Sequence, residues 1–468
     1  MKCRIVSNKE LFETNRFDGS FHNAEMNVYD TVIKKHSSHA LKYFCDDIFT
    51  SGRNKRVYTL EEYGYPFLSN SDVSTYNPFM ACKYSSKKIG NDEKAFLKEG
   101  MIVTGRVGAI GQTSYVPYFW EKEKAQGSDN IIRISVKQEY KRGFIYAYLS
   151  SKMGNMALWK LATGGVQPFI TDIMVGGIAI PDFPDVLSAK INSLIIESSQ
   201  LRGSAFEKLK ISQKELQQCA NLPELEPEYY DFYGLPSDGR SVSTFVRRKS
   251  DLSLSINAFN YSERIRILED KIRECCKTVP LHEVIEDGHF FSTGSFPRVE
   301  VSKDFGIMLI NQSDIFDSII KGKYISKRGV KTDNLVDYGE VLIAGVGTLG
   351  ENEIFCRTIF ANEDLQGQLV SGEFIRMKAN ETVPAGYLYS WLSSGYGFRL
   401  IRSTQTGTKQ CRPIQKMLLN KPIPIIDKTS MEKIDLMVRD AHTLLYQSNQ
   451  KERQAIQMVE EEIEKWNN

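Results

Sequence analysis

The sequence of 468 residues lacks the long apolar runs of membrane proteins, since none approaches the roughly 18 apolar residues that a span requires. The first ten residues, MKCRIVSNKE, lack the apolar core of a secretory signal. The eight cysteines form no C-x-x-C pair and no Cys/His spacing that would close a zinc site. Scattered thiols of this kind are typical of a reducing compartment, so we expect a cytoplasmic protein that does not enter a membrane.

Motifs for catalysis are also scarce. G-x-x-x-x-G-K-[ST], G-x-S-x-G and H-E-x-x-H are absent, and Asn77-Pro78-Phe79 lacks the second proline of the Asn/Asp-Pro-Pro-Tyr motif of amino-methyltransferases. GVGTLG at Gly345–Gly350 matches G-x-G-x-x-G, but the next ten residues, ENEIFCRTIF, alternate like a strand. Dinucleotide binding requires a helix to begin there. We therefore predict a strand–turn–strand at this motif, and a chain that is not an enzyme, with no catalytic site, cofactor or metal of its own.

No charge of one sign dominates the composition. Lys and Arg total 60 and Asp and Glu total 58, for a formal net charge of +2. This balance excludes a simple polybasic nucleic-acid binder but leaves local basic surfaces open. A hydrophobic share of 41% and a charged share of 25% exclude wholesale disorder, and the length predicts two to four domains.

The most informative feature of the sequence is an internal duplication. Six blocks recur in the same order, at offsets between 239 and 243 residues. A period this long indicates two copies of a whole domain. The matched blocks are FLSNSDV (Phe67–Val73) with LINQSDI (Leu309–Ile315), KYSSKK (Lys83–Lys88) with KYISKR (Lys323–Arg328), GMIVTGRVGAIG (Gly100–Gly111) with GEVLIAGVGTLG (Gly339–Gly350), GFIYAYLSS (Gly143–Ser151) with GYLYSWLSS (Gly386–Ser394), TGGVQ (Thr163–Gln167) with TGTKQ (Thr406–Gln410), and Ile180-Pro181 with Ile423-Pro424.

A long amphipathic stretch follows each copy. After Pro184 and after Pro424, both stretches lack proline and repeat apolar residues at steps of three and four, which predicts helices of about 35–40 residues, or roughly 50–60 Å. A single narrow stripe on so long a helix favours a coiled-coil seam over two separate surface helices, and the simplest partner of one seam is the other. The stripes consist of Leu187, Ile191, Leu194, Leu201, Ala205, Leu209 and Leu216, and of Ile434, Val438, Ala441, Leu445, Ala455, Val459, Ile463 and Trp466.

Between the helices the chain reads as mixed domains. MIVTG (Met101–Gly105), VLIAG (Val341–Gly345) and IIRIS (Ile131–Ser135) are typical of strands. Glu25–Lys35, Ser262–Cys276 and the blocks GFIYAYLSS and GYLYSWLSS are typical of helices. The predicted fold class is α+β: two similar mixed α/β domains separated by two long helices that form an antiparallel coiled coil. The predicted boundaries are a first domain at 1–182, a helix at 183–221, a Pro/Gly-rich linker at 222–241, a second domain at 242–425 and a second helix at 426–468.

Basic clusters recur at equivalent positions of the two copies. KGKYISKRGVK (Lys321–Lys331) carries five basic residues and no acid. Charge runs are most often solvated faces, but their recurrence favours binding to DNA phosphates, with neighbouring polar loop residues reading base edges. The final stretch, Asp427–Asn468, has nine acidic and six basic residues and is better suited to bind protein. The candidate DNA-binding residues are Arg53, Lys55, Arg56, Lys83, Lys87, Lys88, Gln112, Gln167, Arg298, Lys323, Lys327, Arg328, Lys331, Thr408, Lys409 and Gln410.

Taken together, the sequence resembles the specificity subunit of a type I restriction–modification system. The resemblance covers essentially the whole chain and rests on the order domain, long helix, domain, long helix. It is supported by RFDGSF (Arg16–Phe21) with the weaker SINAFN (Ser255–Asn260), and by the glycine-bounded strand, YAYLSS/YSWLSS, TG-x-x-Q and Ile-Pro blocks. The second copy departs from the first at Asn257, where the first has Asp18.

The resemblance implies a non-catalytic subunit for DNA methylation and phage defence. Each target recognition domain would read one half of a split DNA target, and the helix pair would fix the gap between the halves. The helices would also dock two modification subunits, which bind S-adenosylmethionine and methylate adenine, and restriction subunits could join them.

Three alternatives remain. The first is a recognition subunit of a methyltransferase that has no nuclease. The second is a structural adaptor whose duplicated domains bind protein or carbohydrate. The third is a dinucleotide-dependent enzyme built on GVGTLG.

Overall fold

The computed structural model describes the chain except residues 1–4, 20, 24–30, 34, 90–91, 109, 227–244 and 467–468. The chain forms two compact units. Unit 1 comprises Met1–Gly203 and Gln447–Asn468, and unit 2 comprises Ser204–Tyr446. Because the unit boundaries fall within the two long helices, each of these helices contributes one segment to unit 1 and one to unit 2.

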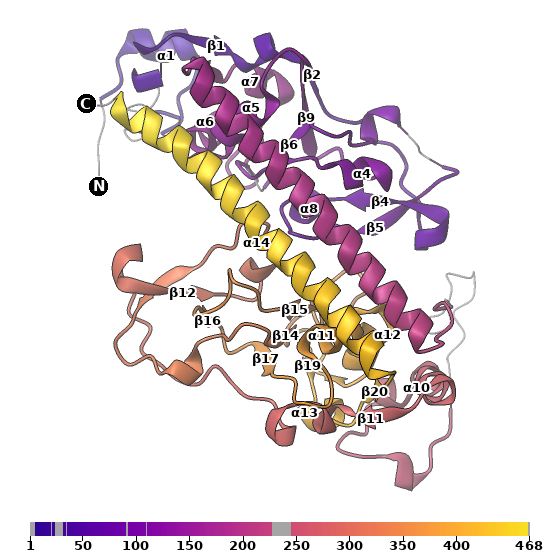
Figure 1. The fold of residues 1–468 in the computed structure, drawn as a ribbon. Coiled ribbons are helices and arrows are strands. Elements are labelled where there is room, and N and C mark those ends of the chain that lie inside the picture. The colour runs from indigo at the N-terminus through magenta and orange to yellow at the C-terminus, as the bar shows by residue number, and fades with distance from the viewer. Residues whose placement is uncertain are drawn as a thin grey trace. The chain divides into compact units, whose positions relative to one another are not determined.

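Unit 1 combines short strands with short helices (Figure 1). Its strands are β1 (Ser38–Ala40), β2 (Cys45–Phe49), β3 (Tyr58–Thr59), β4 (Gly64–Leu68), β5 (Lys83–Ser86), β6 (Ile102–Gly105), β7 (Thr113–Tyr115), β8 (Gln126–Gly127), β9 (Ile131–Val136) and β10 (Ala179–Pro181). Its shorter helices are α1 (Asn8–Thr14), α3 (Asn70–Val73), α4 (Tyr118–Lys122), α5 (Arg142–Ser150), α6 (Lys152–Leu161) and α7 (Asp172–Gly176), with 3-10 turns η1 (Leu41–Phe44), η2 (Glu61–Tyr63) and η3 (Glu93–Ala95). The strands form sheets in the orders β2-β9-β6-β7, β3-β5-β4-β8 and β1-β10.

Unit 2 repeats this inventory with small differences. Its strands are β11 (Thr278–Pro280), β12 (Gly306–Ile310), β13 (Lys323–Ser326), β14 (Val341–Ala344), β15 (Thr358–Phe360), β16 (Leu369–Val370), β17 (Phe374–Met377), β18 (Gln405–Thr406), β19 (Arg412–Pro413) and β20 (Pro422–Pro424). Its shorter helices are α10 (Glu263–Cys275), α11 (Ala385–Ser393), α12 (Gly395–Arg402) and α13 (Gln415–Leu418). The 3-10 turns are η4 (Lys249–Asp251), η5 (Ala258–Tyr261), η6 (Leu281–Glu283), η7 (Glu286–Gly288), η8 (Lys303–Phe305), η9 (Asp314–Phe316) and η10 (Thr332–Asn334). The sheets run β13-β12-β16, β15-β14-β17, β11-β20 and β18-β19.

The two units share their strand pairing as well as their elements. β4 pairs antiparallel with β5 and parallel with β8, and β12 pairs in the same way with β13 and β16. β6 and β14 are fully buried central strands, each flanked by antiparallel neighbours on both sides. The duplication that the sequence indicates is therefore present in the topology of each unit.

A helical hairpin packs on the strand beside each of these central strands, β7 in unit 1 and β15 in unit 2, and a glycine makes the hairpin possible. α5 joins α6 in unit 1, and α11 joins α12 in unit 2. A Cβ atom on Gly154 would lie 2.1 Å from the carbonyl oxygen of Tyr148, and one on Gly397 would lie 2.1 Å from that of Trp391. Only glycine therefore allows the second helix to turn back so closely on the first.

The RFDGSF and SINAFN blocks fix the start of each copy. The Arg16 guanidinium donates to the carbonyl oxygen of Ala162 at 2.9 Å, just beyond α6. The Asn260 amide donates to the carbonyl oxygens of Ser403 and Gln405 at 2.7 and 2.9 Å, just beyond α12. Different side chains thus make the same tie in the two copies.

The substitution of Asp18 by Asn257 preserves an acceptor. The Asp18 carboxylate accepts from the backbone N–H of Phe21 at 2.9 Å, and the Asn257 side-chain oxygen accepts from that of Phe259 at 3.1 Å. Both side chains supply the oxygen that caps a local turn. Asp18 also forms an ion pair with Arg16 at 2.6 Å, which the neutral Asn257 cannot form.

The two long helices are α8 (Asp185–Cys219) and α14 (Lys428–Lys465), within the predicted 183–221 and 426–468. Asp427 caps the start of α14, because its carboxylate accepts from the Ser430 N–H at 2.9 Å. The hydrogen bonds to Ser430 also lower the pKa of the Asp427 carboxyl. Buried positions recur every three and four residues, as in a coiled coil. They are Ser188, Ile191, Ile195, Ser198, Ala205, Leu209, Ser212 and Leu216 in α8, and Met431, Ile434, Val438, Ala441, Leu445, Ser448, Glu452, Ala455, Val459 and Ile463 in α14, beside which His442 and Asn449 are also buried.

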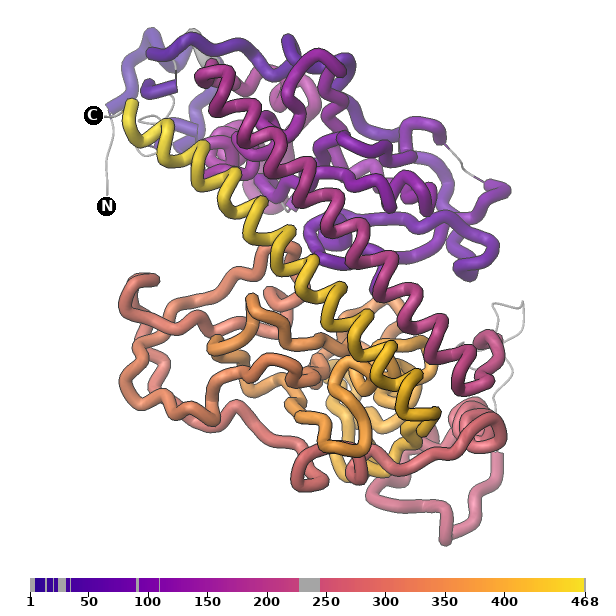
Figure 2. Tube along the Cα trace, viewed as in Figure 1, coloured from indigo at the N-terminus to yellow at the C-terminus, as the bar shows by residue number. Residues whose placement is uncertain are grey.

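In unit 1 the first part of α8 and the last part of α14 lie side by side and antiparallel (Figures 1 and 2). The Ser198 and Ser448 hydroxyls are 2.9 Å apart, and each also donates to the other residue's carbonyl oxygen, at 2.9 and 2.8 Å. Four residues farther along each helix, Arg202 donates to the Glu452 carboxylate at 2.6 Å. The Tyr146 hydroxyl of α5 donates to the same carboxylate, so this buried network joins both helices to the domain.

In unit 2 the remaining segments pair antiparallel through more exposed contacts. Lys433 contacts Glu215 at 2.6 Å, and Lys208 lies 3.6 Å from Asp440. The predicted fold class, with mixed domains and two long antiparallel helices, is confirmed. The predicted domain boundaries stay a prediction, because the compact units divide the chain within the helices.

Each long helix also docks on the domain that precedes it. The Asn192 side chain of α8 accepts from the Gly143 N–H at 2.8 Å, at the start of α5. The Asp435 carboxylate of α14 accepts from the Gly386 N–H at 2.7 Å, at the start of α11. One polar side chain therefore fixes the same helix in the same way in each unit.

Three expectations need comment. The strand-like alternation of ENEIFCRTIF does not correspond to one continuous strand. Residues 351–356 form turns and bends, and only Thr358–Phe360 pairs, in β15. Most of the expected Glu25–Lys35 helix and of the linker at 222–241 lies outside the described residues. Among the described residues, no helix combines the length and apolar character that crossing a membrane requires.

Candidate nucleic-acid interface

The recurring basic residues lie on one sheet of each unit. We call this the basic sheet: β3, β5, β4 and β8 in unit 1, and β13, β12 and β16 in unit 2. Lys83 begins β5 opposite Phe67, and Lys323 begins β13 opposite Leu309. The fold therefore places the two KY-x-SK-[KR] blocks in the same register, as their sequence match predicts.

In unit 1 aromatic rings support the lysines of the basic sheet. The Lys83 ammonium lies 5.0 Å from the centre of the Tyr58 ring, and that of Lys87 lies 5.8 Å from the Tyr65 ring. Lys87 also donates to the carbonyl oxygen of Glu62 at 2.8 Å. Cation–π contacts of this kind hold the lysine stem while leaving the charge at the surface.

The loop before β3 carries the other basic cluster of unit 1. Arg56 forms an ion pair with Asp129 and lies 5.0 Å from the ring centre of Phe67. Arg53 reaches the same carboxylate at 3.3 Å, although its own side chain is 80% exposed. Lys55 between them is exposed. One buried acid thus engages two of the three predicted cations.

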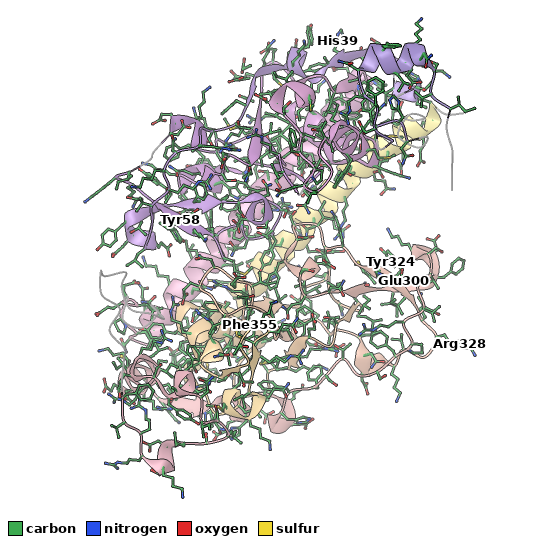
Figure 3. All side chains as sticks on the ribbon, turned by 180° about the vertical axis from the view of Figure 1, so that it is seen from behind. His39, Tyr58, Glu300, Tyr324, Arg328 and Phe355 are labelled. Carbon is green, nitrogen blue, oxygen red and sulfur yellow. The ribbon has the colours of Figure 1, made fainter. Side chains whose placement is uncertain are left out.

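The strand β5 and its counterpart β13 end in similar turns. The backbone N–H of Lys88 donates to the Ser86 hydroxyl at 3.2 Å, and that of Arg328, labelled in Figure 3, donates to the Ser326 hydroxyl at 3.3 Å. Both basic side chains are exposed. Serine hydroxyls therefore shape both turns in the same way, and each turn carries an exposed basic side chain.

In unit 2 the basic residues differ in their partners. Lys323 forms an ion pair with Glu300 at 2.5 Å. Lys327, Lys331 and Arg298 are exposed, and none forms an ion pair with another described residue. The second copy therefore offers cations from its turns and loops more than from its strand.

The glycine-rich loop and the TG-x-x-Q loop meet in unit 1. The backbone N–H of Gly108 donates to the carbonyl oxygen of Pro168 at 3.2 Å. Gln112, at the end of the first loop, is half-buried, and Gln167, in the second, is exposed. The fold thus brings two predicted base-reading segments together, with one of the two glutamines fully at the surface.

The equivalent loops meet in unit 2. Gly347 and Cys411 exchange two backbone hydrogen bonds, of 3.2 and 2.8 Å. Thr408, Lys409 and Gln410 are all exposed, in the turn between β18 and β19. These three side chains therefore stand at the surface, beside a loop that no helix follows.

A side-chain amide ties each glycine-rich loop to the basic sheet. Asn70, just after β4, donates to the carbonyl oxygen of Val107 at 2.8 Å. Gln312, just after β12, donates to the carbonyl oxygen of Val346 and accepts from its N–H at 3.0 Å. The sheet and the loops of each unit therefore form one connected surface.

An arginine cluster lies beside the glycine-rich loop of unit 2, and the sequence alone does not predict it. Arg399 and Arg402 both contact the Glu351 carboxylate, the first at 3.2 Å. Arg357 donates to the Glu351 carbonyl oxygen at 2.6 Å, and burial lowers the pKa of its guanidinium to about 10. Only the i, i+3 spacing of Arg399 and Arg402 was visible in sequence, because Glu351 and Arg357 reach them through the fold.

Within the described ranges, no three His, Cys, Asp or Glu side chains gather as they would around a metal ion. Burial raises the pKa of the Cys45 and Cys82 thiols to about 12, so both remain protonated near neutral pH. The residues of the basic sheet and loops are suited to contact phosphates and base edges rather than to transfer protons.

No protein-family model matches the chain, and no curated protein matches its sequence. Solved structures similar to it include the S subunit of a type I restriction–modification system from M. genitalium, with 11% identity, 92% of each chain covered and a TM-score of 0.33. The HsdS subunit from Thermoanaerobacter tengcongensis has 13% identity over 91% of this chain and 95% of its own, with a TM-score of 0.27.

A third similar structure concerns complex assembly and conformational transition of the type I restriction–modification system. It has 13% identity over 92% of this chain and 96% of its own, with a TM-score of 0.28. These proteins are of the family that the sequence resembles. Because the TM-scores and identities are low, the function proposed below rests on the residues of this chain.

Proposed function

We propose that the chain is the DNA-specificity subunit of a type I restriction–modification complex. Each target recognition domain reads one half of a bipartite target. The helix pair sets the spacing of the halves and docks two modification subunits, to which restriction subunits can be added. The chain itself is not an enzyme.

One observation carries this proposal. Each copy of the duplicated domain presents the same basic sheet, joined by an amide side chain to the same pair of loops. A protein that reads two half-sites needs a phosphate grip and a base-reading loop in duplicate. A duplicated enzyme would instead need duplicated catalytic groups.

The residues divide into two roles. The lysines and arginines of the basic sheet and its turns bind phosphates and fix the position of each domain on the duplex. The polar residues of the loops, Gln112 and Gln167 in unit 1 and Thr408, Lys409 and Gln410 in unit 2, read base edges. Because these loop residues differ between the copies, the two half-sites have different sequences.

The long helices have the partner role. Glu432, Asp440, Glu461 and Glu464 of α14 are exposed. Exposed carboxylates of this kind repel DNA and suit a protein partner. The modification subunits that dock there supply S-adenosylmethionine, which is the methyl donor, and this chain holds no cofactor of its own.

Methylome sequencing tests the proposal. Cells that express this chain with its modification subunit should carry methylated adenine in both halves of a split, asymmetric motif. Cells that express the modification subunit alone should lack this mark. An unsplit motif, or the same methylation without this chain, would contradict the proposal.

An electrophoretic shift assay separates the alternatives. The complex of this chain with the modification subunits should select duplexes with the methylated motif from a random pool. Selective binding with methylation but no cleavage, in cells that express every neighbouring gene, would favour a methyltransferase without a nuclease. A complex with no sequence-selective binding would favour a structural adaptor. Binding of a dinucleotide in a fluorescence titration would favour the enzyme built on GVGTLG.

A further inference from the structure

The basic sheets of the two units have matching positions but different acids. Tyr58 of unit 1 pairs with Ser85, and Glu300 of unit 2 bridges to Ile325, at the same place of β5 and β13. The acid beside the lysine strand is therefore present only in unit 2, where unit 1 has a tyrosine. Figure 3 labels Tyr58 and Glu300, each on its own unit.

A second pair of positions shows the reverse difference. Arg56 and Arg298 each lie two residues before these positions, in the loop that leads to the basic sheet. Asp129, which engages Arg56, lies two residues after β8. Gly372 lies two residues after β16 in unit 2. The acid beside the loop arginine is therefore present only in unit 1.

These acids decide which of the two matched cations, Arg56 or Lys83, is available in unit 1. Arg56 and Arg53 both contact Asp129, whose side chain is only 8% exposed. Lys83 rests on the Tyr58 ring and forms no ion pair with any described residue. Asp72, the acid that acts on it through space, is bound to Ser69. Of the two matched positions in unit 1, the loop arginine Arg56 thus has a carboxylate partner, whereas the strand lysine Lys83 forms no ion pair with a described residue. Lys55 of the loop, where unit 2 has Pro297, is a further exposed cation outside this comparison.

In unit 2 the available cation is on the loop. Lys323 contacts Glu300 at 2.5 Å, and both side chains are more than 60% exposed. Arg298 lies 6.0 Å from the centre of the Phe296 ring, and forms no ion pair within the described part of the chain. A phosphate approaching Lys323 would meet the Glu300 charge, whereas one approaching Arg298 would not.

We propose that the two recognition domains grip DNA phosphates at different places on the same framework: at Lys83 on the strand of unit 1, and at Arg298 on the loop of unit 2. The ligand in both cases is a backbone phosphate of duplex DNA, and the inference rests on the function proposed above. A carboxylate beside a cation cancels much of its attraction for a phosphate at the few ångströms that separate them. The exposed turn cations, Lys88 and Arg328, remain common to both copies.

The experiment measures affinity against salt concentration. The full chain in complex with the modification subunits is titrated with a duplex that carries the motif found by methylome sequencing. Lys83→Met and Arg298→Met should each reduce the slope of log affinity against log salt by about 1. This corresponds to a roughly fourfold smaller loss of affinity between about 50 and 200 mM salt.

Matched variants at the paired cations serve as comparisons. Arg56→Met should change the slope by clearly less than Lys83→Met does. The same is expected of the double variant Lys323→Met with Glu300→Gln, which removes both charges of the ion pair. Glu300→Gln alone frees Lys323 and should increase the slope. Tyr58→Glu gives unit 1 the acid of unit 2 and should reduce it. Lys83→Gln repeats the test should Lys83→Met impair assembly, which size-exclusion chromatography monitors.

The outcomes separate the inference from the function on which it rests. Equal slope changes for Lys83→Met and the double variant, or an unchanged slope for Glu300→Gln, would overturn the inference while the wild-type complex still selects its motif. A wild-type complex without sequence-selective binding would refute the proposed function, and the inference with it.

Discussion

The two copies bury an arginine at the same place but satisfy it differently. Arg133 of β9 lies opposite Val103 of β6, and Arg376 of β17 lies opposite Leu342 of β14. Both arginine side chains are completely buried. A charge in such a position must be compensated by its surroundings.

In unit 1 the arginine donates hydrogen bonds to carbonyl oxygens, while the carboxylates of Asp92 and Asp129 act on it only through space. The Arg133 guanidinium donates to the backbone of Ser128, Ile131, Ala95 and Gly127. Burial lowers the pKa of this group to about 10. Its Nε finds no partner among the described residues.

In unit 2 a carboxylate takes part. Arg376 forms two bonds of 2.9 Å to Glu340 and others to the carbonyl oxygens of Asn334 and Leu335. Met101 stands at the place of Glu340 in unit 1, since each follows a glycine of positive φ at the start of the buried strand. The same strand arrangement therefore holds a buried arginine with a hydrogen-bonded carboxylate in unit 2 and without one in unit 1. Its geometry does not depend on a particular ion pair.

The largest expected difference between the two copies is the loss of stability when the buried arginine is replaced. Arg376→Met leaves the Glu340 carboxylate buried and unpaired, which costs about 4 kcal/mol. Arg133→Met strands no carboxylate and should cost about 2 kcal/mol, from lost hydrogen bonds. Urea denaturation measures both, with the exposed Glu373→Gln as control. Equal losses would mean that the carboxylate contributes nothing distinctive to unit 2.

The helix pair offers the next contrast, between a buried and an exposed ion pair. Glu452→Gln should lower the free energy of unfolding by about 3 kcal/mol, because the charge of the buried Arg202 loses its partner. Glu215→Gln, which removes the more exposed contact with Lys433, should cost less than about 1 kcal/mol. Denaturant titration compares the two amides, and a larger loss for Glu215→Gln would contradict this view.

A buried histidine distinguishes unit 2 at low pH. His442 of α14 packs on the rings of Phe360 and Tyr389, and burial lowers its pKa from 6.5 to about 3. Its counterpart in α8, seven residues after Asn192, is Ser199. The unfolded chain therefore binds a proton between pH 6.5 and 3 that the folded chain does not, so stability falls as the pH falls through this window.

The expected loss from this histidine is about 2 kcal/mol between pH 7 and pH 5. His442→Leu should remove that part of the pH dependence, whereas His39→Leu in unit 1, at an exposed position, should not. Urea titrations at the two pH values measure the difference. An identical pH profile for His442→Leu and the wild type would rule out this role.

The smallest expected effect concerns the amides that tie the loops. Gln312→Ala loses two hydrogen bonds to Val346 and should cost about 2 kcal/mol, whereas Asn70→Ala loses one bond to Val107 and should cost about 1 kcal/mol. Hydrogen exchange should show faster exchange of the glycine-rich loop in each variant, with the larger change in unit 2. Equal changes would indicate that the second bond of Gln312 adds no stability.

The sequence predicted those parts of the architecture that leave a repeating pattern of residues. The apolar steps of three and four residues predicted both long helices to within a few residues of their ends. The matched blocks predicted equivalent strands, because β6 and β14 follow directly from two short apolar runs. The polar layer of the helix pair was missed, since Ser198 contributes nothing to an apolar pattern.

The candidate site was less predictable than the fold. The basic residues of Lys83–Lys88 and Lys323–Arg328 were identified by their recurrence, and they lie where the repeat indicated. Which of them is neutralised depends on partners that the chain brings from elsewhere, such as Asp129 for Arg56, 73 residues away. Neither local composition nor spacing reports such a partner, so only the folded structure reveals which cations are available.

The reciprocal contact of Ser198 with Ser448 limits how far α8 and α14 can slide along each other. A shift of the helices by one heptad would place Ser198 opposite Ala441 or Ala455, and would move Arg202 away from Glu452 to face an apolar residue. Burying an unpaired guanidinium is costly, so neighbouring registers are strongly disfavoured. The helices therefore have one preferred register, and we expect that only insertion or deletion of residues would change it.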